Sequence, residues 1–284
     1  MQEFHNRLKI GIYSLGLIGG SLYKGLAKFG GANLILCTRN QETIASLSKL
    51  GENISANPEV LSDAQIIFVC SPISKVVDNI KKLYEINPHA VFVDVASLKY
   101  DILTQIEQIN GCKFIGSHPM AGTENSGFKA SFPELFEGAK WVVTPSKYIN
   151  NDDVNLLCTI IELLGASPVL MDAGDHDKAV AAISHLPMLL SQSMVFNIKN
   201  DKNALLLAAS GFRDTTRLAV SNKIMAKDML QFNKKNIKSA LEDVVKYANE
   251  LLLSEFFDEN IETIIKTRKN LYNASGKNSF RNNG

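Results

Sequence analysis

The sequence predicts an α/β protein in which a doubly wound, mainly parallel sheet is followed by an all-helical domain. Apolar runs of strand length alternate with helix-length amphipathic segments up to Met171, and after Ala173 only helical patterns remain. Alternating strands and helices joined by right-handed crossovers place helices on both faces of one sheet. We therefore divide the chain into domains at residues 1–173 and 174–284.

The expected elements follow in order along the chain. Strands are predicted at Leu8–Tyr13, Asn33–Cys37, Gln65–Cys70, Ala90–Val95, Lys113–Ser117, Lys140–Thr144 and Ser167–Met171. Helices between them are predicted at Leu17–Phe29, Gln41–Leu50, Ile73–Glu85, Lys99–Gln108 and Asp152–Leu164. The helical domain should contain Asp175–Asn200, Asp201–Ala209, Asp214–Ala219, Ile224–Phe232 and Ile237–Phe257, several opening with a capping aspartate. The polar residues 272–284 are expected to fray.

The composition argues against several classes of function. Lys+Arg 30 against Asp+Glu 29 leaves a formal charge of +1, which gives no electrostatic reason to expect nucleic acid or an anionic membrane as partner. We expect no membrane span, because no apolar run comes near a length of about 18 residues. The four cysteines lack a Cys-x-x-Cys pair and mostly lie in apolar runs, so we expect reduced thiols, no zinc site and a cytoplasmic protein.

The apolar faces of the helical domain are more extensive than one slim bundle can bury. This suggests that the domain packs against a second copy of the chain. Periodicity alone does not separate such a dimer interface from core.

A nucleotide-binding fingerprint follows the first strand. Residues 14–19 read Ser-Leu-Gly-Leu-Ile-Gly, which fits G-x-G-x-x-G with Ser14 in place of the first glycine. Gly16 would let a pyrophosphate approach the backbone, Gly19 would let the helix pack on the strand, and the N–H groups at Leu17 and Ile18 would bind phosphate. We expect the serine to weaken the tight turn. This pattern predicts a Rossmann-type domain, although glycines that only form a turn, with no dinucleotide, remain an alternative here.

The end of the second strand indicates which dinucleotide is bound. An NAD enzyme tends to place a carboxylate about 20 residues beyond the glycines, and none stands here. Thr38 and Arg39 instead offer a hydroxyl and a guanidinium suited to a 2′-phosphate. We therefore expect NADP+, with NAD+ as the alternative because Glu42 lies close by and Arg39 could be a solvated surface residue. Ser71 and Pro72 end the next long strand, where the sheet would face a bound nicotinamide.

A candidate catalytic residue lies in the segment Ser117–Gly127, which follows an apolar run and contains glycines and a proline. Histidine is the side chain best suited to moving a proton near neutral pH, so we expect His118 to handle the proton of a redox reaction. Ser97 follows the preceding predicted strand and could bond a substrate hydroxyl or the His118 imidazole. Asp94 and Lys99 are expected to have structural roles, as a turn former and a first-turn helix residue.

Four blocks of sequence together resemble the prephenate and arogenate dehydrogenases, most of all the compact cyanobacterial type. In order, they are Ser97-Leu98-Lys99, the segment from His118 to Glu124, Asp175-His176-Asp177 with Ser184-His185-Leu186-Pro187, and the segment from Gly211 to Ala219. The resemblance extends from about Leu8 to about Phe257, and it implies neither a chorismate mutase region nor a regulatory ACT domain.

The resemblance implies a reaction of L-tyrosine biosynthesis. This is the oxidative decarboxylation of arogenate or prephenate with NADP+, in which a hydride leaves C4 for the nicotinamide, carbon dioxide departs and the ring becomes aromatic. His118 would take the proton of the 4-hydroxyl group, and Ser97 would orient that hydroxyl.

The resemblance also implies how the substrate is bound. Arg217 would bind the substrate carboxylate and His185 the substrate side chain. Arg213 would join an ionic network with Glu124 and Asp214 near the entrance, beside Thr123. A homodimer formed through the helical domain is also implied.

His176 lies nine residues before His185, about half a rotation away on a straight α-helix. We therefore expect His176 to be a cap or interface residue outside the site. A metal site built on the two histidines should fail for the same geometric reason.

Two other functions are compatible with parts of the sequence. A dehydrogenase for a β-hydroxyacid or an imine would usually centre its chemistry on a lysine, and a non-catalytic NADP-binding sensor would need neither His118 nor Arg217. The sequence does not identify the group that separates arogenate from prephenate, which differ only in their side chain. Similarity to the cyanobacterial type favours arogenate.

Overall fold

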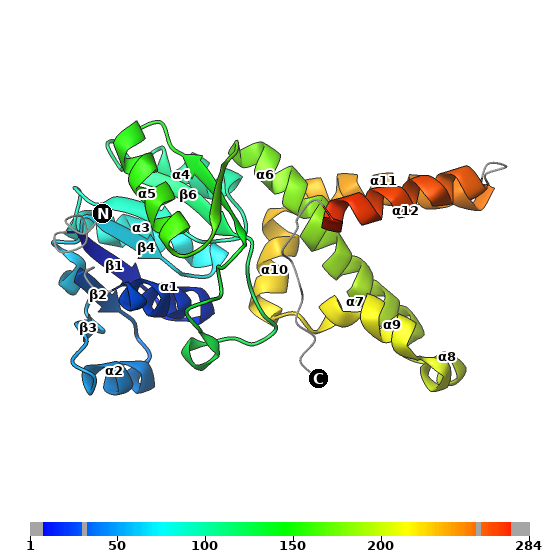
Figure 1. The fold of residues 1–284 in the computed structure, drawn as a ribbon, viewed down its shortest axis with the longest axis horizontal. Helices are drawn as coiled ribbons and strands as arrows, with labels where there is room; N and C mark the ends of the chain where they lie inside the picture. Colours follow the sequence, from blue (N-terminus) through cyan, green and yellow to red (C-terminus); the bar gives the residue numbers. More distant parts are fainter. Residues whose placement is uncertain (1–7, 30–32, 254–256, 274–284) are drawn as a thin grey trace.

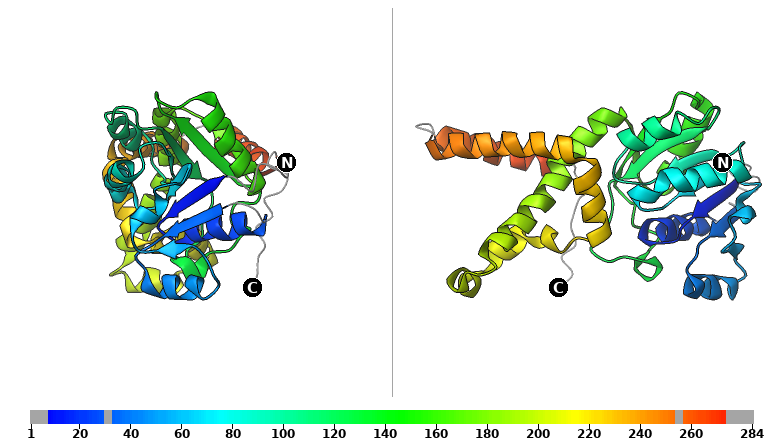
Figure 2. Two further views of the ribbon diagram at one scale, coloured as in Figure 1. Left: turned by 90° about the vertical axis from the view of Figure 1, so that its left-hand side faces the viewer. Right: turned by 180° about the vertical axis from the view of Figure 1, so that it is seen from behind.

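The computed structural model describes residues 8–29, 33–253 and 257–273, which form a sheet domain followed by a helical domain (Figure 1). Helices cover both faces of the sheet. The helical domain joins it through α6, and its last two helices extend away from the sheet domain (Figure 2).

Within the described residues, one sheet of eight strands has the order β3-β2-β1-β4-β5-β6-β7-β8. Every neighbouring pair is parallel except β6 and β7, as expected for a mainly parallel sheet. The strands are β1 Lys9–Tyr13, β2 Asn33–Cys37, β3 Ile54–Ser55, β4 Ile66–Val69, β5 Val91–Asp94, β6 Phe114–Pro119, β7 Lys140–Pro145 and β8 Ser167–Leu170. The two-residue β3 was not predicted because it is too short to show a period.

Strand β6 is longer than predicted. It runs to Pro119, so His118 lies inside the strand and not on the turn after it. The reason is antiparallel pairing with β7, which sets His118 opposite Val142.

The predicted doubly wound architecture is confirmed by two separate cores. One face of the sheet packs Leu22, Trp141 and Leu157 among its buried residues, and the other packs Ile80 and Phe92. The helices of this domain are α1 Leu17–Lys28, α2 Gln41–Ser48, α3 Ile73–Ile86, α4 Tyr100–Ile106 and α5 Asn151–Leu163, with 3-10 turns η1 Pro58–Leu61 and η2 Phe128–Ala130.

The helical domain begins with one continuous helix, Ala173–Ile198, that contains a wide π turn. Pro187 follows this turn, lacks an N–H for the helical ladder and crowds the carbonyl four residues before it, which accounts for the local widening. The elements are α6 Ala173–Val180, the π turn η3 Ala181–His185, α7 Leu186–Ile198, α8 Lys202–Leu207, α9 Ser210–Thr215, the 3-10 turn η4 Arg217–Val220, α10 Lys223–Phe232, α11 Lys234–Leu253 and α12 Phe257–Asn273.

Two predictions for this domain are wrong. The helix predicted at Asp214–Ala219 is instead α9 followed by η4, so Asp214 lies within α9 and does not cap a helix. The hydroxyl groups of Thr215 and Thr216 donate back to the carbonyls of Gly211 and Phe212, a competing bond typical of a helix end. The predicted frayed tail is also wrong at Tyr272 and Asn273, which belong to α12, while residues 274–284 lie outside the described residues.

The helix Ala173–Ile198 is long and apolar enough to cross a membrane by length and composition alone. The expectation that no segment reaches this length is therefore wrong. The buried residues at its start, His176 and Asp177, contact the sheet domain.

The two domains are held together by carboxylates of the helical domain. Neither α3 nor α4 has a capping side chain of its own. Asp228 of α10 accepts hydrogen bonds from the backbone N–H and hydroxyl of Ser74 at 3.2 and 3.0 Å. Asp177 of α6 accepts from the backbone N–H groups of Lys99 and Tyr100 at 2.9 and 3.0 Å. Both helix starts are thus completed across the domain boundary.

Replacing Asp228 should destabilise the protein through loss of this cap. We expect Asp228→Ala to lower the free energy of unfolding by about 1–2 kcal/mol, and Asp228→Asn, whose amide oxygen can still accept, to lower it by less than half as much. Urea denaturation measures both, with Asp243→Ala on the exposed face of α11 as the control. Equal stability of Asp228→Ala and the control would contradict the capping role.

Candidate active site

The predicted functional residues of the sheet domain lie along the edge of the sheet formed by the carboxyl ends of its parallel strands. Strands β1, β4, β5 and β6 are parallel neighbours, so their carboxyl ends meet there. The fingerprint turn follows β1, Ser71 follows β4, Ser97 follows β5, and His118 lies at the end of β6. The connections from β1 and β4 run in opposite directions across the sheet, and such a switch point is where α/β folds bind ligands.

The turn after β1 retains its tight geometry despite the serine. Ser14 has φ +74°, the left-handed conformation that glycine usually supplies, and its N–H donates to the carbonyl of Cys37 at 2.7 Å. A Cβ on Gly19 would lie 2.2 Å from the carbonyl oxygen of Ser14. Helix α1 therefore approaches this turn as closely as predicted, and only glycine fits at position 19.

The start of α1 suits a pyrophosphate. A Cβ built on Gly16 would meet nothing within 4 Å, which leaves open space above the turn. No side chain caps the helix, and its first turn holds no acidic residue. The N–H groups of Leu17 and Ile18 therefore remain available, and the helix dipole favours an anion here.

The end of β2 carries an uncompensated cation. Thr38 is buried, whereas Arg39 is exposed and forms no ion pair among residues 8–29, 33–253 and 257–273. Glu42, the nearby acid, pairs instead with Lys129. No carboxylate therefore occupies the position where an NAD enzyme binds the ribose 2′-hydroxyl.

Ser71 and Ser97 occupy neighbouring strand ends. Ser71 is buried and accepts a hydrogen bond from the amide of Asn79 at 2.8 Å, and Pro72 precedes the first residue of α3. Ser97 is half-buried. In the described part of the chain no hydrogen bond joins Ser97 to His118, so the suggested contact between them is not observed.

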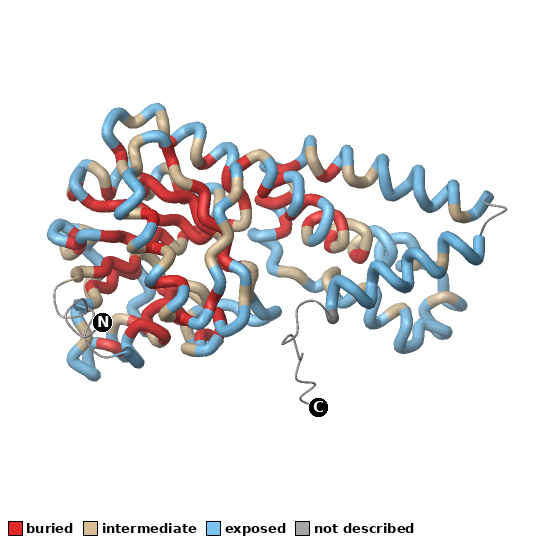
Figure 3. Tube along the Cα trace, turned by 45° about the horizontal axis from the view of Figure 1, so that its top comes forward, coloured by how far each residue is buried: buried red, intermediate tan, exposed pale blue. Residues whose placement is uncertain are grey.

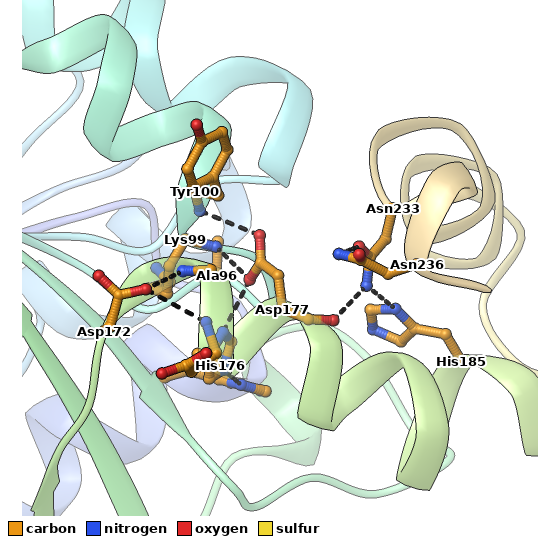
Figure 4. A network of polar contacts seen from close by, with 12 residues as sticks. Ala96, Lys99, Tyr100, Asp172, His176, Asp177, His185, Asn233 and Asn236 are labelled. Atoms are coloured by element: carbon orange, nitrogen blue, oxygen red, sulfur yellow. Dashed lines mark hydrogen bonds and ion pairs between the residues drawn. The ribbon is translucent and has the colours of Figure 1, made fainter. Parts of the chain in front are cut away.

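The imidazole of His118 instead contacts His176. Nδ1 of His118 lies 3.0 Å from Nε2 of His176, and the rings meet edge to face with centroids 5.2 Å apart. Nδ1 of His176 lies 2.8 Å from Oδ1 of Asp177 (Figure 4). Nε2 of His118 has no hydrogen-bond partner among the described residues and is not sealed from solvent. His118 thus presents one free nitrogen at the edge of the sheet.

The prediction that His176 lies outside the site is wrong. It assumed a straight α-helix, whereas the π turn η3 separates His176 from His185 and changes the rotation between them. Both histidines lie near enough to His118 to lower its pKa. No group of three or more His, Cys, Asp or Glu side chains is arranged to hold a metal ion in the described part of the chain.

His118 is electrostatically held neutral. Burial, followed by the electrostatic effects of the nearby His176, Lys99 and His185, lowers the pKa of His118 well below its ordinary 6.5. Burial likewise lowers the pKa of His185, to about 4. A neutral imidazole with a free nitrogen can accept a proton near neutral pH.

A buried ion pair lies close to His118. The side chains of Lys99 and Asp94 are fully buried and paired with each other. Asp94 also accepts from the backbone N–H groups of Ala96 and Ser117, each at 3.0 Å. Burial raises the pKa of Asp94 and lowers that of Lys99. The turn role of Asp94 is confirmed, but Lys99 precedes α4, and its buried charge also acts on His118.

The expected ionic network at the entrance is only partly present. Arg213 pairs with Asp214, Nε to Oδ1, at 3.5 Å on the surface. Glu124 and Thr123 are exposed on the loop after β6, and within the described residues Glu124 forms no ion pair. The network therefore lacks its predicted third member.

Arg217 is exposed at the start of η4, which packs against α7. In the described residues no acid pairs with its guanidinium. His185, just before α7, is buried and directs Nδ1 to the Asn233 amide nitrogen at 3.1 Å, while its Nε2 has no partner. Within the described residues, the guanidinium of Arg217 and Nε2 of His185 can therefore each form further hydrogen bonds.

The order of these features along the chain matches one known family. Residues 25–170 match the nucleotide-binding domain of prephenate dehydrogenase, and residues 172–267 match the prephenate dehydrogenase dimerization domain. The chain belongs to the prephenate dehydrogenase family. It is an NAD(P)-dependent prephenate/arogenate dehydrogenase, an oxidoreductase of tyrosine biosynthesis.

Three relatives support this family membership. The prephenate dehydrogenase of Lactococcus lactis subsp. cremoris (strain MG1363) is 30% identical over 257 residues, covering 86% of this chain and 70% of the relative. The crystal structure of Synechocystis arogenate dehydrogenase is 32% identical, with a TM-score of 0.79 over 95% of this chain and 99% of that one. Prephenate dehydrogenase from A. aeolicus, solved in complex with hydroxyphenyl propionate and NAD+, is 28% identical, with a TM-score of 0.84 over 94% and 98%.

The two glycines of the fingerprint should respond differently to alanine. Gly19→Ala forces a Cβ against the Ser14 carbonyl, so we expect a loss of about 1–3 kcal/mol in the free energy of unfolding. Gly16→Ala meets no protein atom, so it should change stability by less than about 0.5 kcal/mol yet weaken dinucleotide binding about tenfold or more. Thermal melts and fluorescence titration measure the two effects. Unchanged affinity in Gly16→Ala would show that no pyrophosphate approaches this turn.

Proposed function

We propose that this protein catalyses the NADP+-dependent oxidative decarboxylation of arogenate to tyrosine, with His118 as the general base. The observation that carries the proposal is the free Nε2 of a neutral His118 at the sheet edge that also holds the fingerprint turn. A base placed beside the expected nicotinamide position is what oxidation of a secondary alcohol requires.

In the proposed reaction, His118 Nε2 takes the proton from the 4-hydroxyl as the C4–H bond breaks. When bound, the nicotinamide accepts the hydride from C4. The electrons of the bond to the ring carboxylate then enter the ring as carbon dioxide leaves. The resulting phenolate oxygen takes the proton back from His118, so the product is an aromatic phenol and the base is restored. Ser97, half-buried at the end of β5, is proposed to orient the hydroxyl toward His118.

The helical domain is proposed to bind the substrate anion. Arg217 is exposed and unpaired within the described residues, which leaves its guanidinium free for a carboxylate. His185 is proposed to contact the side chain of the substrate. Arg213, Glu124 and Thr123, all exposed, are proposed to line the entrance.

NADP+ is the proposed cofactor because Thr38 and Arg39 offer donors without a competing carboxylate. The pairing of Glu42 with Lys129 supports this, since it leaves Arg39 free. Ser14, Gly16, Leu17, Ile18 and Gly19 would hold the pyrophosphate, and Ser71 with Pro72 would face the nicotinamide.

Prephenate is the second candidate substrate, and His185 favours it. The side-chain nitrogen of Asn233 donates to the carbonyl of Asp177 at 2.8 Å, so this atom is the NH2 group of the amide. The same NH2 group donates its second hydrogen to His185, so Nδ1 of His185 is the acceptor. Nε2 of neutral His185 is then a buried donor without a partner. Such a donor suits a keto oxygen better than an ammonium group.

A homodimer formed through the helical domain is the proposed assembly. Large apolar side chains on this domain are exposed, with Leu206 at 82% and Leu253 at 84%. Figure 3 shows α11 and α12 largely exposed, and Ile237 is the buried residue of α11. A second copy covering these faces would remove the apolar surface from water. We also place the protein in the cytoplasm, where its four free cysteines would remain reduced.

Initial rates of nicotinamide reduction with arogenate and prephenate, each with NADP+ and NAD+, test the proposal. We expect the highest kcat/KM with arogenate and NADP+, and a loss of about 10³-fold in His118→Ala. His89→Ala, at an exposed histidine on a loop, is the matched control. Faster turnover of prephenate would select the second candidate. Binding of cofactor without turnover of either substrate would leave only the sensor function.

The cofactor assignment has its own test. We expect Arg39→Ala to raise KM for NADP+ by about 10- to 100-fold and to leave KM for NAD+ nearly unchanged, because only NADP+ carries the 2′-phosphate. An equal effect on both dinucleotides would contradict recognition of the 2′-phosphate by Arg39.

A further inference from the structure

The carboxylate of Asp177 is held in one orientation by three contacts. Oδ1 accepts from the backbone N–H of Lys99 at 2.9 Å, Oδ2 accepts from that of Tyr100 at 3.0 Å, and Oδ1 also lies 2.8 Å from Nδ1 of His176. Both oxygens are acceptors for backbone donors, as in an ionised carboxylate. A carboxylate can only accept, so Nδ1 of His176 carries the proton in this contact.

The proton on His176 determines the proton on His118. When His176 is neutral, its imidazole has one N–H, and that N–H is used toward Asp177. Its Nε2 is then a lone pair and must accept, so Nδ1 of His118 is the donor across the 3.0 Å contact. With its single proton on Nδ1, neutral His118 has an unprotonated Nε2.

We propose that His176 and Asp177 are positioning residues that fix the tautomer of His118 with Nε2 unprotonated and stabilise the imidazolium formed in the reaction. This inference rests on the proposed function. Once Nε2 has taken the substrate proton, the Nδ1–H of His118 points to His176, which in turn points to the carboxylate of Asp177. No proton needs to leave His176, since the carboxylate acts through its charge and through the orientation of the ring.

Charged groups near His118 affect how stable its imidazolium form is. Lys99 opposes a positive charge on His118, and Asp94 offsets that of Lys99 through their buried ion pair. Asp177 is the other carboxylate that acts on this cluster, reaching both Lys99 and His185. The contacts of His118 with His176 and of His176 with Asp177 link an imidazolium at His118 to this carboxylate.

The same carboxylate docks α6 on the start of α4 (Figure 4). His118 belongs to the sheet domain and its two positioning residues belong to the helical domain. The tautomer of the base is thus set only when the two domains are in contact.

The wild-type tautomer can be measured without substrate. In protein labelled with 15N-histidine, ring-nitrogen chemical shifts at neutral pH should show His118 with Nδ1 protonated and Nε2 bare, and His176 with Nδ1 protonated. His89→Ala and His176→Phe assist the assignment. A proton on Nε2 of His118 would overturn the proposal whatever the enzyme turns over.

Kinetics of variants test the contribution to catalysis. We expect Asp177→Asn to lower kcat by about 100-fold or more, because the amide can donate to His176 and reverse both tautomers, while the Kd for NADP+ stays within about twofold. Asp172→Asn is the matched control, since the Asp172 side chain caps the same helix without bonding a histidine and asparagine caps equally well.

The outcomes separate the two proposals. Normal kcat in Asp177→Asn, in an enzyme that turns over substrate, would overturn the positioning role and leave the proposed function intact. A second outcome is a protein that oxidises neither substrate but shows the expected His118 tautomer, with that tautomer lost in Asp177→Asn. This result would support the positioning of His118 and overturn the proposed function. His176→Phe, which keeps the ring and removes both nitrogens, should lose kcat as Asp177→Asn does.

Discussion

The rest of the site depends on where the carboxylate of Asp177 is held. It completes the start of α4, a helix with no capping side chain of its own, and it orients His176 against His118. A backbone cap, a domain contact and a hydrogen bond within the candidate active site thus share one side chain. Because a cap contributes about 1 kcal/mol and a charge-assisted bond more, its loss affects docking and chemistry together.

The site is divided between two domains with different tasks. The sheet supplies the fingerprint turn and His118 from the ends of parallel strands, whose positions are fixed by a packed core on each face. The helical domain carries His176, which contacts His118, and the proposed substrate-binding residues His185 and Arg217. Burying several ionisable groups together is costly unless charges are paired, and the pair of Lys99 and Asp94 meets that requirement beneath the site. Burial, followed by the nearby His176, Lys99 and His185, lowers the pKa of His118 well below its ordinary value and favours its neutral form.

The sheet domain could be predicted from the sequence because its signals are local. Strand periodicity and the fingerprint at Gly16 and Gly19 located the nucleotide edge, and the left-handed Ser14 shows that a serine can occupy the first glycine position. The role of His176 could not be predicted, because the π turn before Pro187 alters the rotation that a straight helix would impose. The helix caps formed by Asp177 and Asp228 join segments far apart in sequence, so no local sequence pattern predicts them. Helix α12 was not predicted from the sequence, although its acidic first turn, Asp258 and Glu259, is a signal for the start of a helix.

The central claim is that a neutral His118 accepts the substrate proton. The pH dependence of kcat/KM tests it most directly, since this quantity reports the ionisation of the free enzyme. The lowered pKa of His118 keeps the base unprotonated as pH falls through 6.5, so activity should stay level there and decline only at distinctly lower pH. A decline centred at or above pH 6.5 would mean that His118 is not held neutral by its surroundings, and would contradict the account.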